Sequence, residues 1–145
     1  MDRTQPYRAQ HREIIGLAGS LTGSLDPERL TGDPEPIHAA LLDLAAKLRA
    51  HLRLEDHELY PELLRHGKGP VRELAAAYQA EMGRIHGEFE ALVTRWETAE
   101  ALRMDPYGFS VELLSALDVL HRRIHLEDRE LYPLVDRLDA GGAEA

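Results

Sequence analysis

Histidine and glutamate side chains occupy positions where helical periodicity would place core residues. Within residues 41–59 the leucine spacing is interrupted by Glu55, and His51 lies one turn earlier on the same edge. Within residues 113–138 Glu127 takes the place of a leucine in the same way. Imidazole and carboxylate groups without thiolates are ligands that suit iron, manganese or zinc. These positions therefore predict a metal site between helices.

Two further segments carry side chains of the same kinds. His11 stands among apolar residues near the N-terminus, and Glu81 and His86 lie on or beside the apolar stripe of residues 74–96. Counted from the expected helix ends at about 1.5 Å per residue, four of these residues can meet in one polar layer: His11, Glu55, Glu81 and Glu127. Buried carboxylates are costly and repel one another unless a cation neutralises them. The layer therefore predicts a bound metal ion.

The elements that must position these residues are four helices. Glycine and proline clusters divide the chain into four segments in which apolar residues recur every three or four positions. The segments are 6–21, 36–65, 70–98 and 108–138. Because the second and third connections are short, neighbouring helices should be antiparallel. We expect an all-α fold, an up-down-up-down four-helix bundle that forms one domain over residues 1–145.

The second and fourth segments contain an internal sequence repeat, called the echoed motif below. Residues 54–61 read LEDHELYP and residues 126–133 read LEDRELYP, identical at seven of eight positions. In an up-down bundle these helices run the same way, so the two copies should lie at equal depth, related by a pseudo-twofold. Pro61 and Pro133 end the copies although apolar periodicity continues past them, and we expect a kink or an overlapping helix end at each.

Composition excludes several classes of protein. The net charge of −9 opposes binding to nucleic acid, because phosphate binding needs a surplus of Lys and Arg. No apolar run approaches the roughly 20 residues that cross a bilayer, and residues 1–15 contain no signal-peptide core. The chain has no cysteine, which excludes disulfides and thiol chemistry. We expect a cytoplasmic protein without nucleic-acid or membrane partners, as a monomer or homodimer.

The motif His51-Leu-Arg-Leu-Glu55, followed by Glu-Leu-Tyr-Pro, resembles the hemerythrin-like, or HHE cation-binding, domains. The resemblance covers nearly the whole chain. It implies a four-helix bundle with two iron ions, oxo- or carboxylate-bridged, that binds oxygen or nitric oxide or senses redox state or iron. It also implies that His11, His51 and Glu55 are ligands.

The second half departs from the family pattern. Where the third helix should present two histidines a turn apart, the chain has Met82 and His86, and on the fourth helix Arg123 stands where a histidine is expected. Glu81 and His121 are the nearest substitutes. The predicted metal ligands are His11, His51, Glu55, Glu81, His86, His121 and Glu127. A carboxylate-richer centre, or a single occupied metal position, would follow.

Three functions remain open on the sequence. The first is an iron centre, with zinc or manganese as other metals, that binds or senses a small diatomic ligand or peroxide; we favour such a binding protein over an enzyme. The second is a carboxylate-rich di-iron oxidoreductase, a ferroxidase or peroxidase. The third is a metal-free interaction bundle in which Arg123 neutralises Glu55 or Glu127. Ordinary pairing also competes, since Glu81 and Glu127 could form salt bridges and His51 with Glu55 a simple helix pair.

Overall fold

Four long helical rods make up most of the computed structural model, which describes residues 3–66 and 69–140. The described part of the chain contains no strand, so the prediction of an all-α fold is confirmed. The rods consist of α1 (Gln5–Gly23); α3 (Glu35–Leu54), η1 (Glu55–Leu59) and α4 (Tyr60–His66); α5 (Pro70–Arg95); and α7 (Pro106–Leu126), η2 (Glu127–Leu131) and α8 (Tyr132–Ala140).

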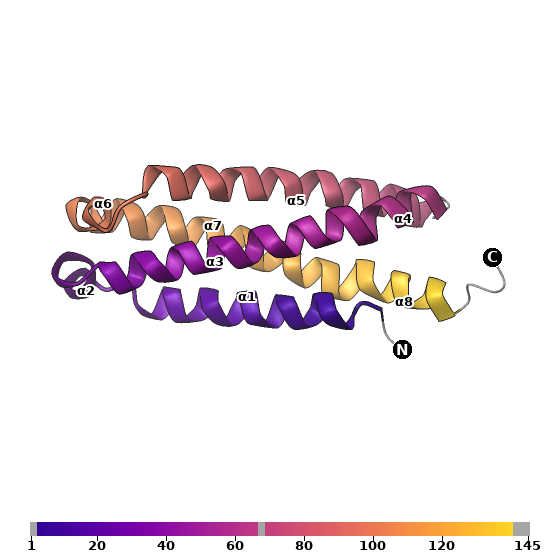
Figure 1. Ribbon diagram of the computed structural model, residues 1–145, viewed down its shortest axis with the longest axis horizontal. Coiled ribbons are helices and arrows are strands. Elements are labelled where there is room, and N and C mark those ends of the chain that lie inside the picture. Colours follow the sequence, from indigo (N-terminus) through magenta and orange to yellow (C-terminus); the bar gives the residue numbers. More distant parts are fainter. Residues whose placement is uncertain (1–2, 67–68, 141–145) are drawn as a thin grey trace.

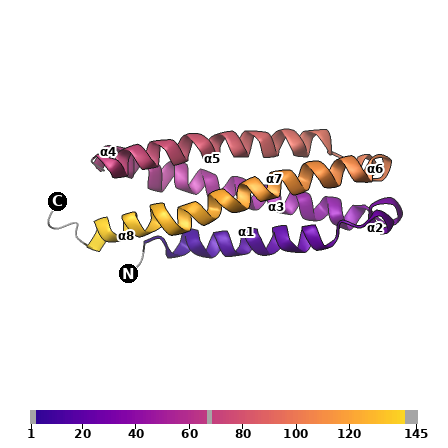
Figure 2. The same ribbon diagram turned by 180° about the vertical axis from the view of Figure 1, so that it is seen from behind.

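The rods lie lengthwise beside one another, and the colour order shows that successive rods run in opposite directions (Figures 1 and 2). Helix α3 contacts both α1 and α5, and α7 contacts both α5 and α1. The second and fourth rods therefore run the same way. Each of them contains one copy of the echoed motif.

Two short helices occupy connections where the sequence indicated turn residues. Helix α2 (Pro27–Gly32) and helix α6 (Ala99–Met104) contact each other at one end of the molecule. Each begins with a side-chain cap, because Asp26 accepts from the Arg29 N–H at 2.9 Å and Thr98 from the Ala101 N–H at 3.2 Å. The third segment accordingly ends as a helix at Arg95 rather than continuing to residue 98.

The polar layer divides the apolar core into two clusters. On α1, Tyr7 belongs to one cluster and Ile14 to the other, and His11 lies between them in the chain. On the fourth rod, Glu127 lies in the same way between Ile124 and Leu131. A fully buried leucine or isoleucine contributes about 1.5–3 kcal/mol, so these clusters hold the rods together on both sides of the polar groups.

Both copies of the echoed motif contain one π-helical turn. The Tyr60 N–H donates to the Glu55 carbonyl and the Tyr132 N–H to the Glu127 carbonyl, five residues back in each case. The wider turn precedes Pro61, which has no N–H to donate and whose ring would press on the carbonyl four residues back in a regular α-helix. The helices therefore continue past both prolines.

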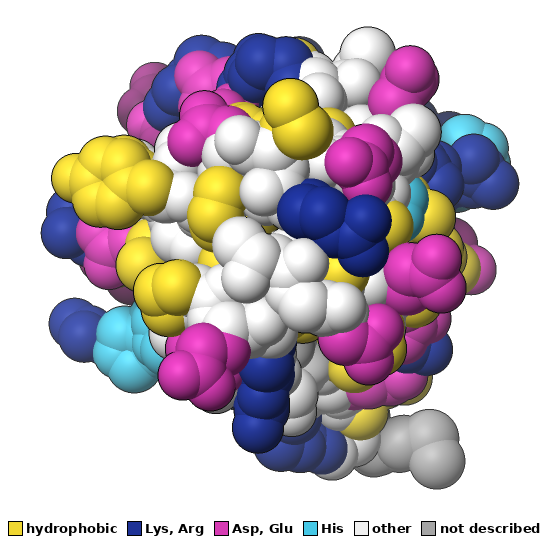
Figure 3. Space-filling view, turned by 90° about the vertical axis from the view of Figure 1, so that its left-hand side faces the viewer, with side chains coloured by type: hydrophobic (Ala, Val, Ile, Leu, Met, Phe, Trp, Pro, Cys, Tyr) yellow, Lys and Arg dark blue, Asp and Glu magenta, His cyan; other side chains and the backbone are white. Residues whose placement is uncertain are grey.

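The surface carries charged and apolar side chains side by side. At the end that holds α2 and α6, hydrophobic side chains are interspersed with acidic and basic ones (Figure 3). Tyr107, near the start of α7, is 81% exposed. Among the described helices, none has the length and apolar content needed to cross a membrane.

Candidate metal centre

Four side chains from three rods converge in the polar layer. His11 comes from α1, His51 from α3, Glu55 from η1 and Glu127 from η2, and none is more than 2% exposed. One donor atom from each lies within 4.8 Å of all the others. His11 Nε2 is 3.0 Å from His51 Nε2 and 3.3 Å from Glu127 Oε1, and His51 Nε2 is 3.1 Å from Glu55 Oε1. The structure thus brings together four of the seven predicted ligands.

Hydrogen bonds fix the orientation of both imidazoles. His11 Nδ1 lies 2.8 Å from Asp128 Oδ1, and His51 Nδ1 lies 2.6 Å from Gln10 Oε1. Both partners are oxygen acceptors, so each neutral ring carries its proton on Nδ1. In this neutral form each Nε2 presents a lone pair toward the centre of the cluster, which is the arrangement of a metal-binding histidine held by an outer partner.

The two carboxylates are held by tyrosines from the opposite copy of the motif. The Tyr60 hydroxyl donates to Glu127 Oε2 at 2.6 Å, and the Tyr132 hydroxyl donates to Glu55 Oε2 at 2.6 Å. Oε1 of each glutamate is buried and has no hydrogen-bond donor among the residues that the structure describes. Each of these oxygens faces an imidazole nitrogen, His11 Nε2 for Glu127 and His51 Nε2 for Glu55, and a cation bound among these atoms would satisfy both carboxylates.

The charges of the cluster shift its protonation equilibria. Burial lowers the pKa of His11, but the hydrogen bond to Asp128 and the nearby Glu127 carboxylate outweigh this effect and raise that pKa from 6.5 to about 9. Burial and the charge of Glu55 raise the pKa of Glu127 above 4.5. The layer thus attracts positive charge, whether as a proton on His11 or as a metal ion. The donor set therefore fits a metal cation.

The other three predicted ligands lie apart from these four. Glu81 pairs with the Arg123 guanidinium at 3.1 Å. His86 Nε2 lies 3.1 Å from Glu90 Oε1 on its own helix, and it is partly exposed. His121 is exposed on α7 and borders a cavity between α7 and α1. Met82, in contrast, is buried in the larger apolar cluster.

Residue types and spacing gave no direct sign of the groups that position the ligands. Asp128 follows Glu127 in the chain, and helical spacing does not place it in the core, yet it holds His11. Gln10 was not singled out, although it precedes His11 in the chain. Tyr60 and Tyr132 were seen as part of the echoed motif without a role. Their signal was the repeat itself, which places a tyrosine five residues after each buried glutamate.

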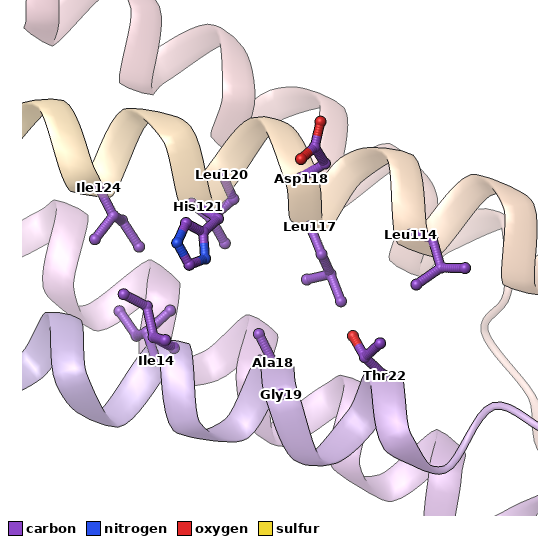
Figure 4. Close-up of a pocket in the computed structure, with 11 residues that line it drawn as sticks. Ile14, Ala18, Gly19, Thr22, Leu114, Leu117, Asp118, Leu120, His121 and Ile124 are labelled. Atoms are coloured by element: carbon purple, nitrogen blue, oxygen red, sulfur yellow. The ribbon is translucent and has the colours of Figure 1, made fainter.

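A cavity of about 580 Å³ lies between α1 and α7 close to this cluster. Figure 4 shows His121 and Leu117 projecting from α7 into the gap, opposite Ala18 and Gly19 of α1. A Cβ added to Gly19 would meet no atom within 4 Å, so the gap is wide at this point. The walls are mostly apolar. They include Ile14 and Ile124, each one helical turn from one of the four ligands.

The fold and the cluster together define an all-helical protein with a buried histidine and carboxylate site suited to a cation. The family model for the hemerythrin HHE cation-binding domain matches residues 4–135, so the chain belongs to this family. Searches of curated proteins and of solved structures find no significant match.

Proposed function

We propose that this protein binds iron in the polar layer and uses it to bind or sense a small ligand such as oxygen, nitric oxide or peroxide. The unpaired Oε1 atoms of Glu55 and Glu127, which face two imidazole Nε2 atoms, are the observation that carries the proposal. Nitrogen and oxygen donors without thiolate suit iron, and they also accept manganese or zinc. A bound iron ion would supply the open coordination position and the redox chemistry that such ligands need.

The protein side chains would supply orientation and exclude water. Asp128 and Gln10 hold the imidazoles, and the hydroxyls of Tyr60 and Tyr132 hold the carboxylates. Such outer partners orient metal ligands and increase the affinity for the ion. Apolar clusters on both sides of the layer keep bulk water away from it.

The cavity between α1 and α7 supports a ligand of small size. The cavity reaches the apolar side chains next to the cluster, and none of the four metal-binding residues lines it. A molecule that enters through this cavity would pass the side chains of Ile14 and Ile124 on its way to the ion. Small, weakly polar molecules such as oxygen or nitric oxide suit this path, whereas larger charged metabolites do not.

The metal-free alternative receives no support from Arg123. This role would require the guanidinium to neutralise Glu55 or Glu127, but its ion pair is with Glu81. The oxidoreductase alternative uses the same buried donors. Catalytic turnover of peroxide, or oxidation of iron(II) in excess over the protein, would distinguish it from reversible ligand binding.

The decisive experiment removes one histidine and one glutamate from the cluster. We expect the double substitution His51→Ala with Glu55→Ala to abolish iron binding, measured by elemental analysis after anaerobic loading with iron(II) and desalting. His57→Ala with Glu73→Ala is a matched control, because both side chains are exposed, and it should retain the iron. Circular dichroism checks that both variants fold. Full iron content in the first variant would refute the proposal.

A further inference from the structure

The two buried carboxylates each have one free oxygen. Oε2 of Glu55 and Oε2 of Glu127 accept short hydrogen bonds from tyrosine hydroxyls at 2.6 Å, while each Oε1 is unpaired. A carboxylate that bridges two metal ions must give one oxygen to each ion. A carboxylate whose second oxygen is held by a hydroxyl is instead arranged to give one oxygen to one ion. Both glutamates are therefore arranged as terminal ligands.

The spacing of the donor atoms also favours a single ion. Metal–ligand distances to histidine nitrogen and carboxylate oxygen are about 2.0–2.2 Å, so two atoms that bind one ion are separated by no more than about 4.4 Å. All four donor atoms of the cluster lie within 4.8 Å of one another. Shifts of a few tenths of an ångström would allow all four to reach a single ion. Donor atoms that bind two different ions are under no such upper limit on their separation.

On the side of the site that faces α5, the two predicted donors of α5, Glu81 and His86, are held by other groups. Arg123 is one helical turn from Glu127 on α7, and its guanidinium lies 4.7 Å from the centre of the Tyr78 ring of α5. Glu81 is held by this guanidinium, and His86 is paired with Glu90. Met82 follows Glu81 on α5 and is buried. Its thioether is a poor ligand for iron. A fixed positive charge here also repels a second cation.

We infer that the centre holds one metal ion per chain, bound by His11, His51, Glu55 and Glu127, rather than the two ions that the family resemblance implies. The inference rests on the proposed function, because it concerns the same site. Arg123, with its positive charge, takes the place of the second ion on the α5 side. Four protein ligands leave room at an octahedral ion for one small molecule, or for two.

Metal counting tests the inference on the full-length protein. Metal-free protein is loaded with iron(II) under exclusion of oxygen, desalted and analysed for iron and protein. Manganese(II) is then bound in a separate sample and its paramagnetic resonance is recorded. We expect one iron per chain and the spectrum of isolated manganese ions. Two irons per chain, with a spectrum of magnetically coupled manganese, would overturn the inference and leave the proposed function standing. Absence of binding would overturn both.

A variant designed to bind a second iron ion tests why the site holds one. In the double variant Met82→His with Arg123→His, two imidazoles replace the thioether and the guanidinium, and we expect two irons per chain. The matched variant Met82→Leu with Arg123→Lys offers no new ligand and should keep one. Circular dichroism and thermal unfolding show whether each variant folds. A folded histidine variant that still binds one iron would refute the assignment of Met82 and Arg123 to the missing position.

His86 and Glu81 provide a second control. Each of the single variants His86→Ala and Glu81→Ala should keep one iron per chain, because neither side chain belongs to the cluster of four ligands. Loss of the iron in either variant would show that the ion is bound closer to α5 than the inference states.

Discussion

The Tyr132 hydroxyl donates a hydrogen bond to Glu55 Oε2 at 2.6 Å, which joins the second copy of the echoed motif to the first. The reverse bond, from Tyr60 to Glu127, has the same length. Each copy thus supplies a carboxylate to the cluster and a hydroxyl to the carboxylate of the other copy. The pseudo-twofold expected from the sequence takes the physical form of these two exchanged hydrogen bonds.

Removal of the exchanged hydroxyls should weaken metal binding without removing a ligand. In Tyr60→Phe and Tyr132→Phe the carboxylate keeps its place but loses the donor that orients it. Loss of such an outer partner typically costs about 10–100-fold in metal affinity, and we expect this decrease for each variant. Competition with a chelator of known affinity measures it.

The control for this prediction is Tyr107→Phe. That side chain is 81% exposed and lies at the start of α7, so the metal affinity should not change. Equal affinity in all three variants and the wild type would mean that the hydroxyls do not orient the glutamates in the metal-bound protein.

Metal affinity should depend on pH through His11. Burial lowers the pKa of His11, but the hydrogen bond to Asp128 and the nearby Glu127 carboxylate outweigh this effect and raise the pKa to about 9. The imidazole must lose its second proton before Nε2 can bind a metal. Affinity for manganese(II) should therefore fall as the pH decreases below about 9, by up to about tenfold per pH unit. Calorimetric titration at several pH values measures it.

The variant Asp128→Asn isolates this effect. The hydrogen bond that His11 donates to Asp128 is the largest cause that raises the pKa of His11, so its loss should lower that pKa. The decrease in affinity should then begin at a lower pH than in the wild type. An unchanged pH profile would show that Asp128 does not control the protonation of His11.

Part of the site could be predicted from helical periodicity. Glu55 and Glu127 interrupt the leucine spacing, and spacing predicts their burial because each is the first residue of its π turn and follows a regular α-helix. The burial of His11 could be predicted from its apolar neighbours, because it lies in the regular helix α1. The all-helical fold followed from the same spacing. Within one regular helix, the phase of a residue relative to the core is fixed by its position.

The rest of the site could not be predicted from spacing for two reasons. A π turn changes the direction in which later side chains point, and some contacts depend on how two helices lie relative to each other. In a regular α-helix, residues five apart point about 140° away from each other, so Tyr60 should not share the face of Glu55. The π turn adds one residue and brings both into the core. Whether Glu81 reaches the cluster or pairs with Arg123 depends on the distance between α5 and α7. The spacing of residues along one helix does not determine that distance.

The cavity between α1 and α7 should control the rate at which a small ligand reaches the ion. Ala18 lines the cavity, partly buried on α1. In Ala18→Phe a large ring would fill the space that Figure 4 shows between the two helices. We expect nitric oxide to associate several-fold more slowly with the iron(II)-loaded variant in stopped-flow measurements, with the iron content unchanged.

Ala76→Phe is the matched control, because Ala76 is exposed on α5 away from the cavity. Its association rate should equal that of the wild type. If Ala18→Phe were as fast as this control, the ligand would reach the ion by a different route.

The buried charge that prepares the site for a metal should make the metal-free protein less stable. Burial and the charge of Glu55 raise the pKa of Glu127 in the folded protein. A raised pKa means that Glu127 favours the folded state at low pH and loses this contribution as the pH rises above its ordinary value of 4.5. At neutral pH the carboxyl group of Glu127 therefore costs stability in the absence of a metal.

Glu127→Gln should remove this cost, because the amide is neutral and has nearly the same shape. With a chelator present at neutral pH, we expect the variant to unfold in urea with a free energy about 1–3 kcal/mol larger than that of the wild type. The difference should vanish in acid, where Glu127 is protonated, and the exposed-site control Glu97→Gln should show no change. Added metal should reverse the order, since the wild type gains stability by binding it and the variant lacks a ligand. A less stable metal-free variant would mean that the pairing of Glu127 with His11 outweighs the cost of its burial.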